Sequence, residues 1–209
     1  MPNESEVEME ITASMVKQLR KKTGAPIMDC KRALVEGNGN LEDAISYLRQ
    51  KSLVTASKKV NRATIDGAIA SYIHPGGKVG VMLELNCETD FVARSDEFRE
   101  LTKNISMHIA ALNPLYLTRE DVDHKVVEKE KEIYLMQAKN SGKPEKVWDK
   151  IVDGKMEKFY SEVCLMEQIY IRDDKLKIED VINGMIAKLG ENISIRRFVR
   201  YQLGEELNQ

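Results

Sequence analysis

The residues most suggestive of chemistry lie in the segment ELNCETDFVARSDEF, residues 84–98, where a thiol and several carboxylates surround a phenylalanine. A catalytic site there would use Cys87 as the nucleophile and Glu88 or Asp90 as the base. A cysteine nucleophile normally has a histidine beside it, and none of the 3 histidines has a spacing that predicts such a pairing. Two carboxylates without further ligands are also a weak signal for a metal ion. We therefore predict neither catalytic residues nor a metal site.

Phe91 leaves two interpretations open. The alternation of the residues before it places Cys87 on the same strand face as Leu83 and Leu85, so Cys87 is predicted to be a core residue. Phe91 either tucks into that core at the junction of strand and helix, or projects with Asp90 from a rigid corner. An aromatic anchor contributes about 2 kcal/mol or more when it fills a partner's pocket. Residue spacing alone does not decide between the two.

The composition describes a helix-rich protein with an aliphatic core. Hydrophobic residues make up 42% of the 209 residues but aromatic ones only 6%, while methionine is frequent, with 10 copies. The 32 basic and 34 acidic residues give a formal net charge of -2. Nonspecific nucleic-acid binding requires a basic excess or stripe, so the charge balance argues against nucleic acid as a partner.

Cysteine usage and the N-terminus indicate where the protein works. The 3 cysteines are scattered and form no CxxC pair, which predicts neither a disulfide framework nor a zinc site and fits a reducing compartment. The first ten residues are acidic and polar, without the features of a signal peptide, and we expect them to be disordered. No apolar run approaches the roughly 18 residues of a membrane span. We expect a cytoplasmic protein that binds no membrane and no cofactor.

The N-terminal part predicts a unit of three short helices. Thr12 and Asn40 are predicted to cap the first and third helices with their hydroxyl and amide groups. Pro26 suits the first turn of the second helix. We place this unit at residues 1–55. A polar and basic stretch at residues 56–64 is predicted to be the linker that follows it.

Beyond the linker the period of the apolar residues changes to two. Alternation predicts strands over residues 65–73 and 79–87, and the glycines between them belong to a hairpin connection instead of a phosphate loop. Further apolar patterns predict helices over 95–112, 118–140, 147–159 and 178–189, and a last strand over 193–203. The fold class is therefore predicted to be α+β, with a small antiparallel sheet covered by helices in a domain of residues 65–209.

Nearly the whole chain resembles the translation elongation factor Ts family. ITASMVKQLRKKTGAPIMDCKRAL, followed by GNGNLEDAISYLR, is similar to the family's ubiquitin-associated-like domain. LELNCETDFVAR resembles its core, and TDFV is the family's most specific motif. HIAALNP, NSGKP and GENISIRRFVRY are similar to further family segments in the same order. The single core resembles the short form of the family, which implies a homodimer.

The resemblance implies a function without covalent chemistry, that of a guanine nucleotide exchange factor for elongation factor Tu. Phe91 would act as a wedge near the Mg²⁺ of that partner, with Asp90 as its polar companion. Thr89 and Val92 would frame the wedge. The other partner contacts that the resemblance implies are Lys31, Leu189 and Gly190.

Two positions depart from the family pattern. Pro26 stands where the family usually has glycine, which is compatible with a helix start. The last strand has Val199 and lacks the cysteine that some short forms carry, which argues against a disulfide-linked dimer.

Two other function classes stay open. A binding module without exchange activity would keep its binding in residues 1–55 alone. A thiol- or carboxylate-dependent enzyme would turn over a small substrate and would lose that turnover in Cys87→Ser.

Overall fold

The structure is a computed structural model that describes residues 11–206, so the predicted disorder of residues 1–10 lies outside the described part. The chain divides into two compact units. The first contains the residues up to Ala63 together with Ile182–Ile193, and the second contains Thr64–Val181 and the residues from Ser194 onward. The division after Ala63 falls at the end of the predicted linker. The prediction assigned residues 182–193 to the second domain, and the structure groups them with the first unit instead.

The elements confirm the α+β class. The strands of the described residues are β1 (Asp66–Ile73), β2 (Val79–Cys87) and β3 (Ile193–Gln202). The helices are α1 (Ala13–Thr23), α2 (Ile27–Glu36), α3 (Leu41–Ser57), α4 (Asp90–Ala93), α5 (Asp96–Leu112), α6 (His124–Lys139), α7 (Trp148–Val163) and α8 (Ile178–Leu189). Short 3-10 turns are η1 (Arg119–Asp121), η2 (Glu145–Val147) and η3 (Leu165–Glu167). α4 was not predicted, because a single turn is too short to show a period.

The first unit contains the three predicted helices α1 to α3. Thr12 caps α1 by accepting a hydrogen bond from the Met15 N–H (3.3 Å), and Asn40 caps α3 by accepting one from the Glu42 N–H (2.8 Å). Pro26 is the N-cap of α2 and thus lies one residue before the predicted position. α3 continues to Ser57, into the predicted linker. The buried core of the three helices consists of Leu19, Cys30, Ala33, Leu34, Ala44 and Leu48.

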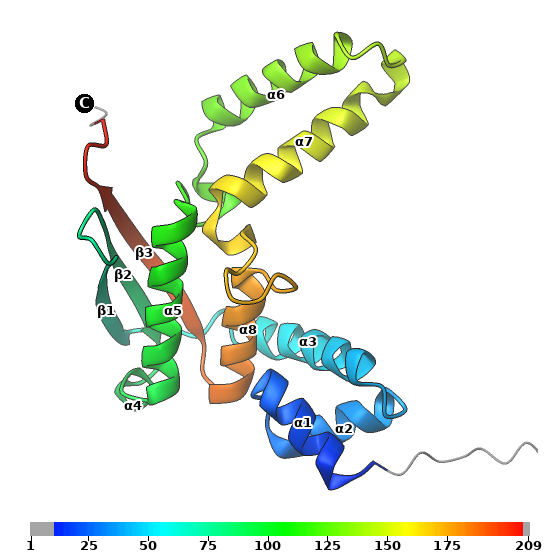
Figure 1. Cartoon of the computed structure of the whole chain (residues 1–209), viewed down its shortest axis with the longest axis vertical. Helices are drawn as coiled ribbons and strands as arrows, with labels where there is room; N and C mark the ends of the chain where they lie inside the picture. The colour runs from blue at the N-terminus through cyan, green and yellow to red at the C-terminus, as the bar shows by residue number, and fades with distance from the viewer. Residues whose placement is uncertain (1–10, 207–209) are drawn as a thin grey trace, which may run out of the picture. The chain divides into compact units, whose positions relative to one another are not determined.

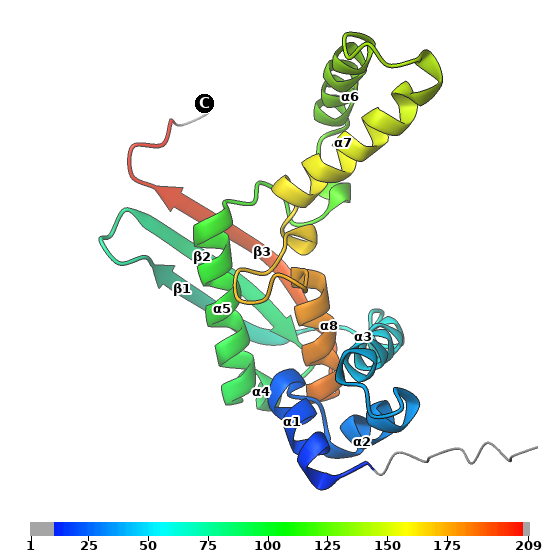
Figure 2. The same ribbon diagram turned by 45° about the vertical axis from the view of Figure 1, so that its right-hand side comes forward.

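The second unit is built on an antiparallel sheet with the strand order β1-β2-β3. α5 lies across one face of this sheet and packs against β1 and β2 (Figures 1 and 2). The apolar face of β2 points toward α5, and its residues Val81, Leu83, Leu85 and Cys87 are buried as predicted. The isoleucines of β1 point to the opposite face, which we call the outer face. Ile69, which lies opposite Glu84 in the register, is 66% exposed there.

Gly67 meets β2 too closely for any side chain. Its φ is +146°, and a Cβ at this position would lie 2.3 Å from the Leu85 carbonyl oxygen. We expect Gly67→Ala to lower the free energy of unfolding by about 3 kcal/mol, because both the φ and the contact with the strand backbone become strained. Gly154→Ala is the matched control, since Gly154 lies within α7 with open space around it. That change should raise the unfolding free energy by about 0.5–1 kcal/mol. Urea unfolding measures both, and equal values for the two variants would contradict the expectation.

α6 and α7 form a helical hairpin within the second unit (Figure 1). The predicted start of the first of these helices at Thr118 is wrong, because α6 begins at His124. The Thr118 hydroxyl and the Asp121 carboxylate do form the predicted cap, but they close the 3-10 turn η1. Asp123 then caps α6 through a hydrogen bond from the Lys125 N–H (2.8 Å).

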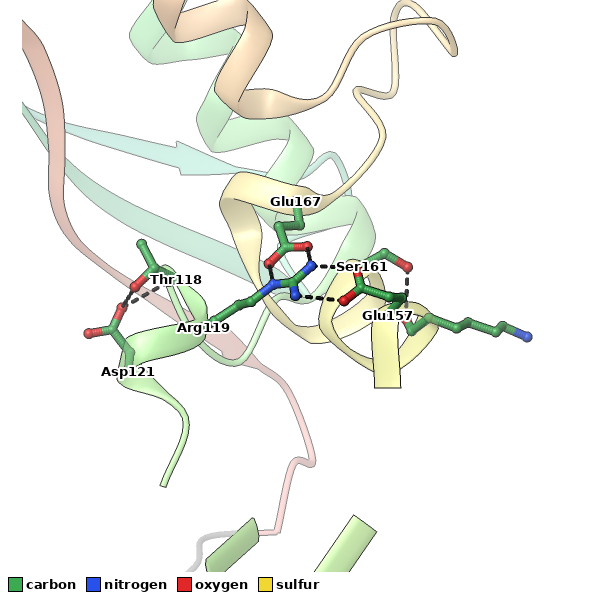
Figure 3. Close-up of polar contacts among 7 residues, drawn as sticks. Thr118, Arg119, Asp121, Glu157, Ser161 and Glu167 are labelled. Atoms are coloured by element: carbon green, nitrogen blue, oxygen red, sulfur yellow. Dashed lines mark hydrogen bonds and ion pairs between the residues drawn. The ribbon is translucent and has the colours of Figure 1, made fainter. Parts of the chain in front are cut away.

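Arg119 anchors the base of this hairpin (Figure 3). Its guanidinium donates to both carboxylate oxygens of Glu157 on α7 (2.8 and 2.7 Å) and also to both oxygens of Glu167 on η3. The same guanidinium lies 4.5 Å from the centroid of the Tyr160 ring. The hydrogen bonds that Arg119 donates to Glu167 and Glu157 raise the pKa of Arg119 and lower that of Glu157. Two bidentate pairs on one rigid guanidinium hold η1, α7 and η3 together.

Candidate functional site

The segment that carries Phe91 is a sharp corner between β2 and α5, which we call the corner (residues 87–95). β2 ends at Cys87, and Thr89 is the N-cap of the single turn α4, where its hydroxyl accepts a hydrogen bond from the Val92 N–H (3.4 Å). α4 packs against β1, β2 and α5. Val92 is buried by this packing, whereas Phe91 is 82% exposed. The structure therefore settles the direction of Phe91, which projects into solvent and does not tuck into the core.

The corner is tied to the end of β2 by Cys87. The buried thiol donates a hydrogen bond to the Thr89 carbonyl oxygen (3.1 Å). Phe98, seven residues after Phe91, is by contrast fully buried at the start of α5. An exposed aromatic side chain on a well-anchored backbone is a feature of binding surfaces, where such residues act as anchors.

Asp90 forms an ion pair with Arg94 on the same turn. The Asp90 side chain is 59% exposed and that of Arg94 is 73% exposed. Pairs this exposed contribute about 0–1 kcal/mol, because solvent screens them. The Asp90 carboxylate can therefore leave Arg94 for a group on a partner at little cost.

The other predicted contact residues belong to the first unit. Lys31 is an exposed residue of α2. Leu189 is the last residue of α8, and Gly190 ends that helix with a φ of +78° and a hydrogen bond from its N–H to the Ile186 carbonyl oxygen (2.9 Å). The Gly190 carbonyl oxygen accepts a hydrogen bond from Lys59. One turn of the second unit thus carries Thr89, Asp90, Phe91 and Val92, whereas these three residues belong to the first unit.

The cysteines are placed as core residues. All three are buried, and burial raises the pKa of the Cys30 thiol and raises that of Cys164 to about 11. The nucleophile is the thiolate, so thiols with a raised pKa are poor nucleophiles at neutral pH. In residues 11–206, no three His, Cys, Asp or Glu side chains are arranged to hold a metal ion. The same range contains no helix both long and apolar enough to cross a membrane.

His108 is a fully buried residue of α5. Its Nε2 lies 3.0 Å from the Gln168 Oε1, and its Nδ1 accepts a hydrogen bond from the Ile171 N–H (3.4 Å). The Gln168 amide in turn donates to the Glu162 carbonyl oxygen (2.7 Å), so the histidine links α5 to the end of α7 and the segment after η3. Protonation of Nδ1 would place two donors against each other. The main cause that lowers the pKa of His108 is its burial, which disfavours the charged imidazolium.

This lowered pKa predicts that the protein loses stability in mild acid. The unfolded chain takes up a proton on His108 near pH 6.5 while the folded protein does not, so stability is complete above that pH and falls below it. We expect the free energy of unfolding to drop by about 1 kcal/mol between pH 7.0 and pH 5.5. In His108→Gln, which cannot gain the proton, urea unfolding at the two pH values should give much closer values. An equal drop in both proteins would show that another group titrates.

The outer face of the sheet carries exposed apolar side chains together with an ion pair between Glu84 of β2 and Arg197 of β3 (2.7 Å). Arg200 of β3 donates from Nε to the Ala110 carbonyl oxygen of α5 (3.3 Å), so its neighbours Val199 and Tyr201 point to the outer face. Tyr201 is 66% exposed. The exposed apolar side chains of this face are Ile69, Ile73, Met82, Val199 and Tyr201. Apolar surfaces of this kind mark sites of association.

A recess lies beside the C-terminal part of α5. It has a volume of about 380 Å³ and is lined mainly by apolar side chains, with the Tyr72 hydroxyl and the His74 Nδ1 in contact at 3.1 Å. Its walls come from β1, from α5 and from Ile171 in the segment after η3. Sequence spacing does not relate these segments, so the recess was not predicted.

Comparison with known proteins gives consistent results. The family model described as elongation factor TS matches residues 6–205. The chain is 55% identical over 201 residues to elongation factor Ts of Syntrophus aciditrophicus, covering 96% of this chain and 100% of that protein. It is 57% identical over 197 residues to elongation factor Ts of Fervidobacterium nodosum, covering 94% and 100%. It is 53% identical over 201 residues to that of Geobacter sulfurreducens, covering 96% and 93%.

Proposed function

This chain belongs to the elongation factor Ts family, and we propose that it is the guanine nucleotide exchange factor of elongation factor Tu in translation elongation. The observation that carries the proposal is the exposed Phe91 on a backbone fixed by buried neighbours. An exchange factor performs no covalent chemistry of its own. It therefore needs no catalytic residue, cofactor or resident metal, and its place is the cytoplasm, without nucleic acid or membrane as a partner.

We propose that Phe91 is the wedge of this exchange reaction. A G protein holds its nucleotide through a phosphate loop, a helix N-terminus and a Mg²⁺ that bridges phosphate oxygens. Phe91 would displace partner side chains near that Mg²⁺. Asp90 would leave Arg94 and compete for groups that organise the metal shell. Thr89 and Val92 would frame the wedge, Thr89 by capping the turn and Val92 by anchoring it in the core.

Exchange then follows from differential binding. The factor must bind the nucleotide-free partner more tightly than the nucleotide-bound one, and the coupling is reciprocal, so returning nucleotide expels the factor. A wedge that occupies the Mg²⁺ site supplies this difference, because it and the bound metal exclude each other. The bound GDP is released and GTP takes its place.

The first unit would supply further contacts. We propose that α1 to α3 form a ubiquitin-associated-like domain, which Lys31 joins to the G domain of the partner. Its exposed position on α2 supports this role. Leu189 and Gly190 would add a second contact, for which the left-handed Gly190 creates a turn directly after α8.

We also propose that the protein is a homodimer that associates through the outer face of the sheet. Three strands present exposed apolar side chains on that face, and the charges of Glu84 and Arg197 on it are paired with each other. The last strand contains no cysteine, so the association would be noncovalent.

The test is the release of a fluorescent GDP from elongation factor Tu, followed by stopped flow with and without this protein. Accelerated release supports the proposal. If release is unchanged, residues 1–55 should be tested for binding alone, because retained binding would favour a module without exchange activity. A turnover reaction that is lost in Cys87→Ser would favour an enzyme, which the buried thiol does not support.

A further inference from the structure

We propose that Ser95 is a positioning residue for nucleotide exchange, because its hydroxyl joins the turn that carries Phe91 to the N-terminus of α5. The inference rests on the proposed function, in which Phe91 is the wedge. Ser95 itself is half-buried, and it would act only through the direction that it gives to α4.

The Ser95 hydroxyl makes two hydrogen bonds of opposite polarity. It donates to the Val92 carbonyl oxygen of α4 (2.7 Å) and accepts from the Phe98 N–H of α5 (3.2 Å). The Ser95 backbone is extended, with φ -66° and ψ 149°, so the two helices are separate elements. One side chain thus bonds both an N–H group at the start of α5 and the Val92 carbonyl group of α4, to which the Ser95 backbone N–H also donates (3.0 Å). Alanine can make neither bond.

Phe91 depends on such a link because α4 has little stability of its own. The helix has 4 residues, and an isolated turn costs more conformational entropy than its hydrogen bonds return. The exposed Phe91 ring adds no core packing that would orient it. α5 is a helix of 17 residues with eight buried side chains, which makes it a rigid support. Ser95 connects the turn to this support on one side, as Cys87 does on the other.

A loose turn would weaken the wedge without removing it. The Phe91 side chain would populate more directions in the free protein, and binding would have to select among them. The loss of a cap of this kind corresponds to about a fivefold change in an equilibrium constant. We expect Ser95→Ala to weaken the affinity for nucleotide-free elongation factor Tu by about fivefold. Ser95→Thr keeps the hydroxyl and should retain the native affinity.

The first measurement does not involve the partner. Amide hydrogen exchange of Ala93, Arg94 and Ser95, whose N–H groups donate to carbonyl oxygens of Thr89, Asp90 and Val92, should become about fivefold faster in Ser95→Ala. The matched control is Ser106→Ala, because the Ser106 hydroxyl donates to the Thr102 carbonyl oxygen within α5 (2.8 Å). Ser95→Thr and the control should exchange like the native protein. Unchanged amides in Ser95→Ala would overturn the proposal.

The second measurement is a double-mutant cycle with Phe91→Ala, using the affinity for nucleotide-free elongation factor Tu. If Ser95 acts through Phe91, Ser95→Ala should weaken binding in the native background and have no effect where the wedge is already absent. An equal loss in both backgrounds would show a structural role only, and the positioning proposal would fail. If the native protein does not promote GDP release at all, the proposed function fails, while the amide measurement still decides whether Ser95 holds the turn.

Discussion

Phe91→Ala should slow the release of GDP from elongation factor Tu by about tenfold or more, at a factor concentration well below saturation. The expected size follows from the role of an aromatic anchor, whose truncation costs about 2 kcal/mol or more, because a tenfold change corresponds to about 1.4 kcal/mol. The fold should not change, since the ring is 82% exposed and leaves the core intact. Stopped-flow release of a fluorescent GDP measures the rate, and circular dichroism checks the fold.

The control for this variant is another exposed apolar side chain. Met136 on α6 is 63% exposed, and Met136→Ala removes a similar apolar surface far along the chain from the corner. Its exchange rate should equal that of the native protein. Phe98→Ala gives the opposite contrast, because Phe98 is fully buried and its loss should destabilise the fold. A normal exchange rate in a folded Phe91→Ala protein would remove the wedge from the mechanism.

Ile69→Lys should convert the proposed dimer into a monomer, raising the dissociation constant by roughly a hundredfold or more. A lysine at this position of β1 would bring a further cation beside Glu84, which already pairs with Arg197, and burying a charge without a partner of its own costs several kcal/mol. The monomer should tolerate the change, because residue 69 is exposed and a lysine there would remain in solvent. Sedimentation velocity over a range of concentrations measures the association.

Ile133→Lys is the control for the dimer experiment. Ile133 is also an exposed isoleucine, but it lies on α6 in the helical hairpin and not on the sheet. This variant should associate like the native protein. If the native protein sediments as a monomer at all concentrations, or if Ile69→Lys still forms the dimer, the outer face is not the interface.

Local signals in the sequence predicted most of the secondary structure correctly. Thr12, Asn40 and Ser95 cap helices because a short polar side chain satisfies a free N–H group wherever a helix begins. The alternation over β2 identified the strand and its buried face, since the side-chain period of a strand is two. The TDFV motif and the other matching segments led to the family, which the comparison with known proteins confirms. These are properties of neighbours along the chain.

The direction of Phe91 and the environment of the charged groups depend on contacts between distant residues. Spacing left Phe91 either in the core or in solvent, because the choice depends on how a four-residue turn packs against β1, β2 and α5. Arg119 finds its partners 38 and 48 residues away, and no periodicity relates it to Glu157 or Glu167. The isoleucines of β1 alternate as clearly as the residues of β2, yet they face solvent. Alternation shows that a strand has an apolar face, but only the packing of α5 on the sheet determines which face becomes the core.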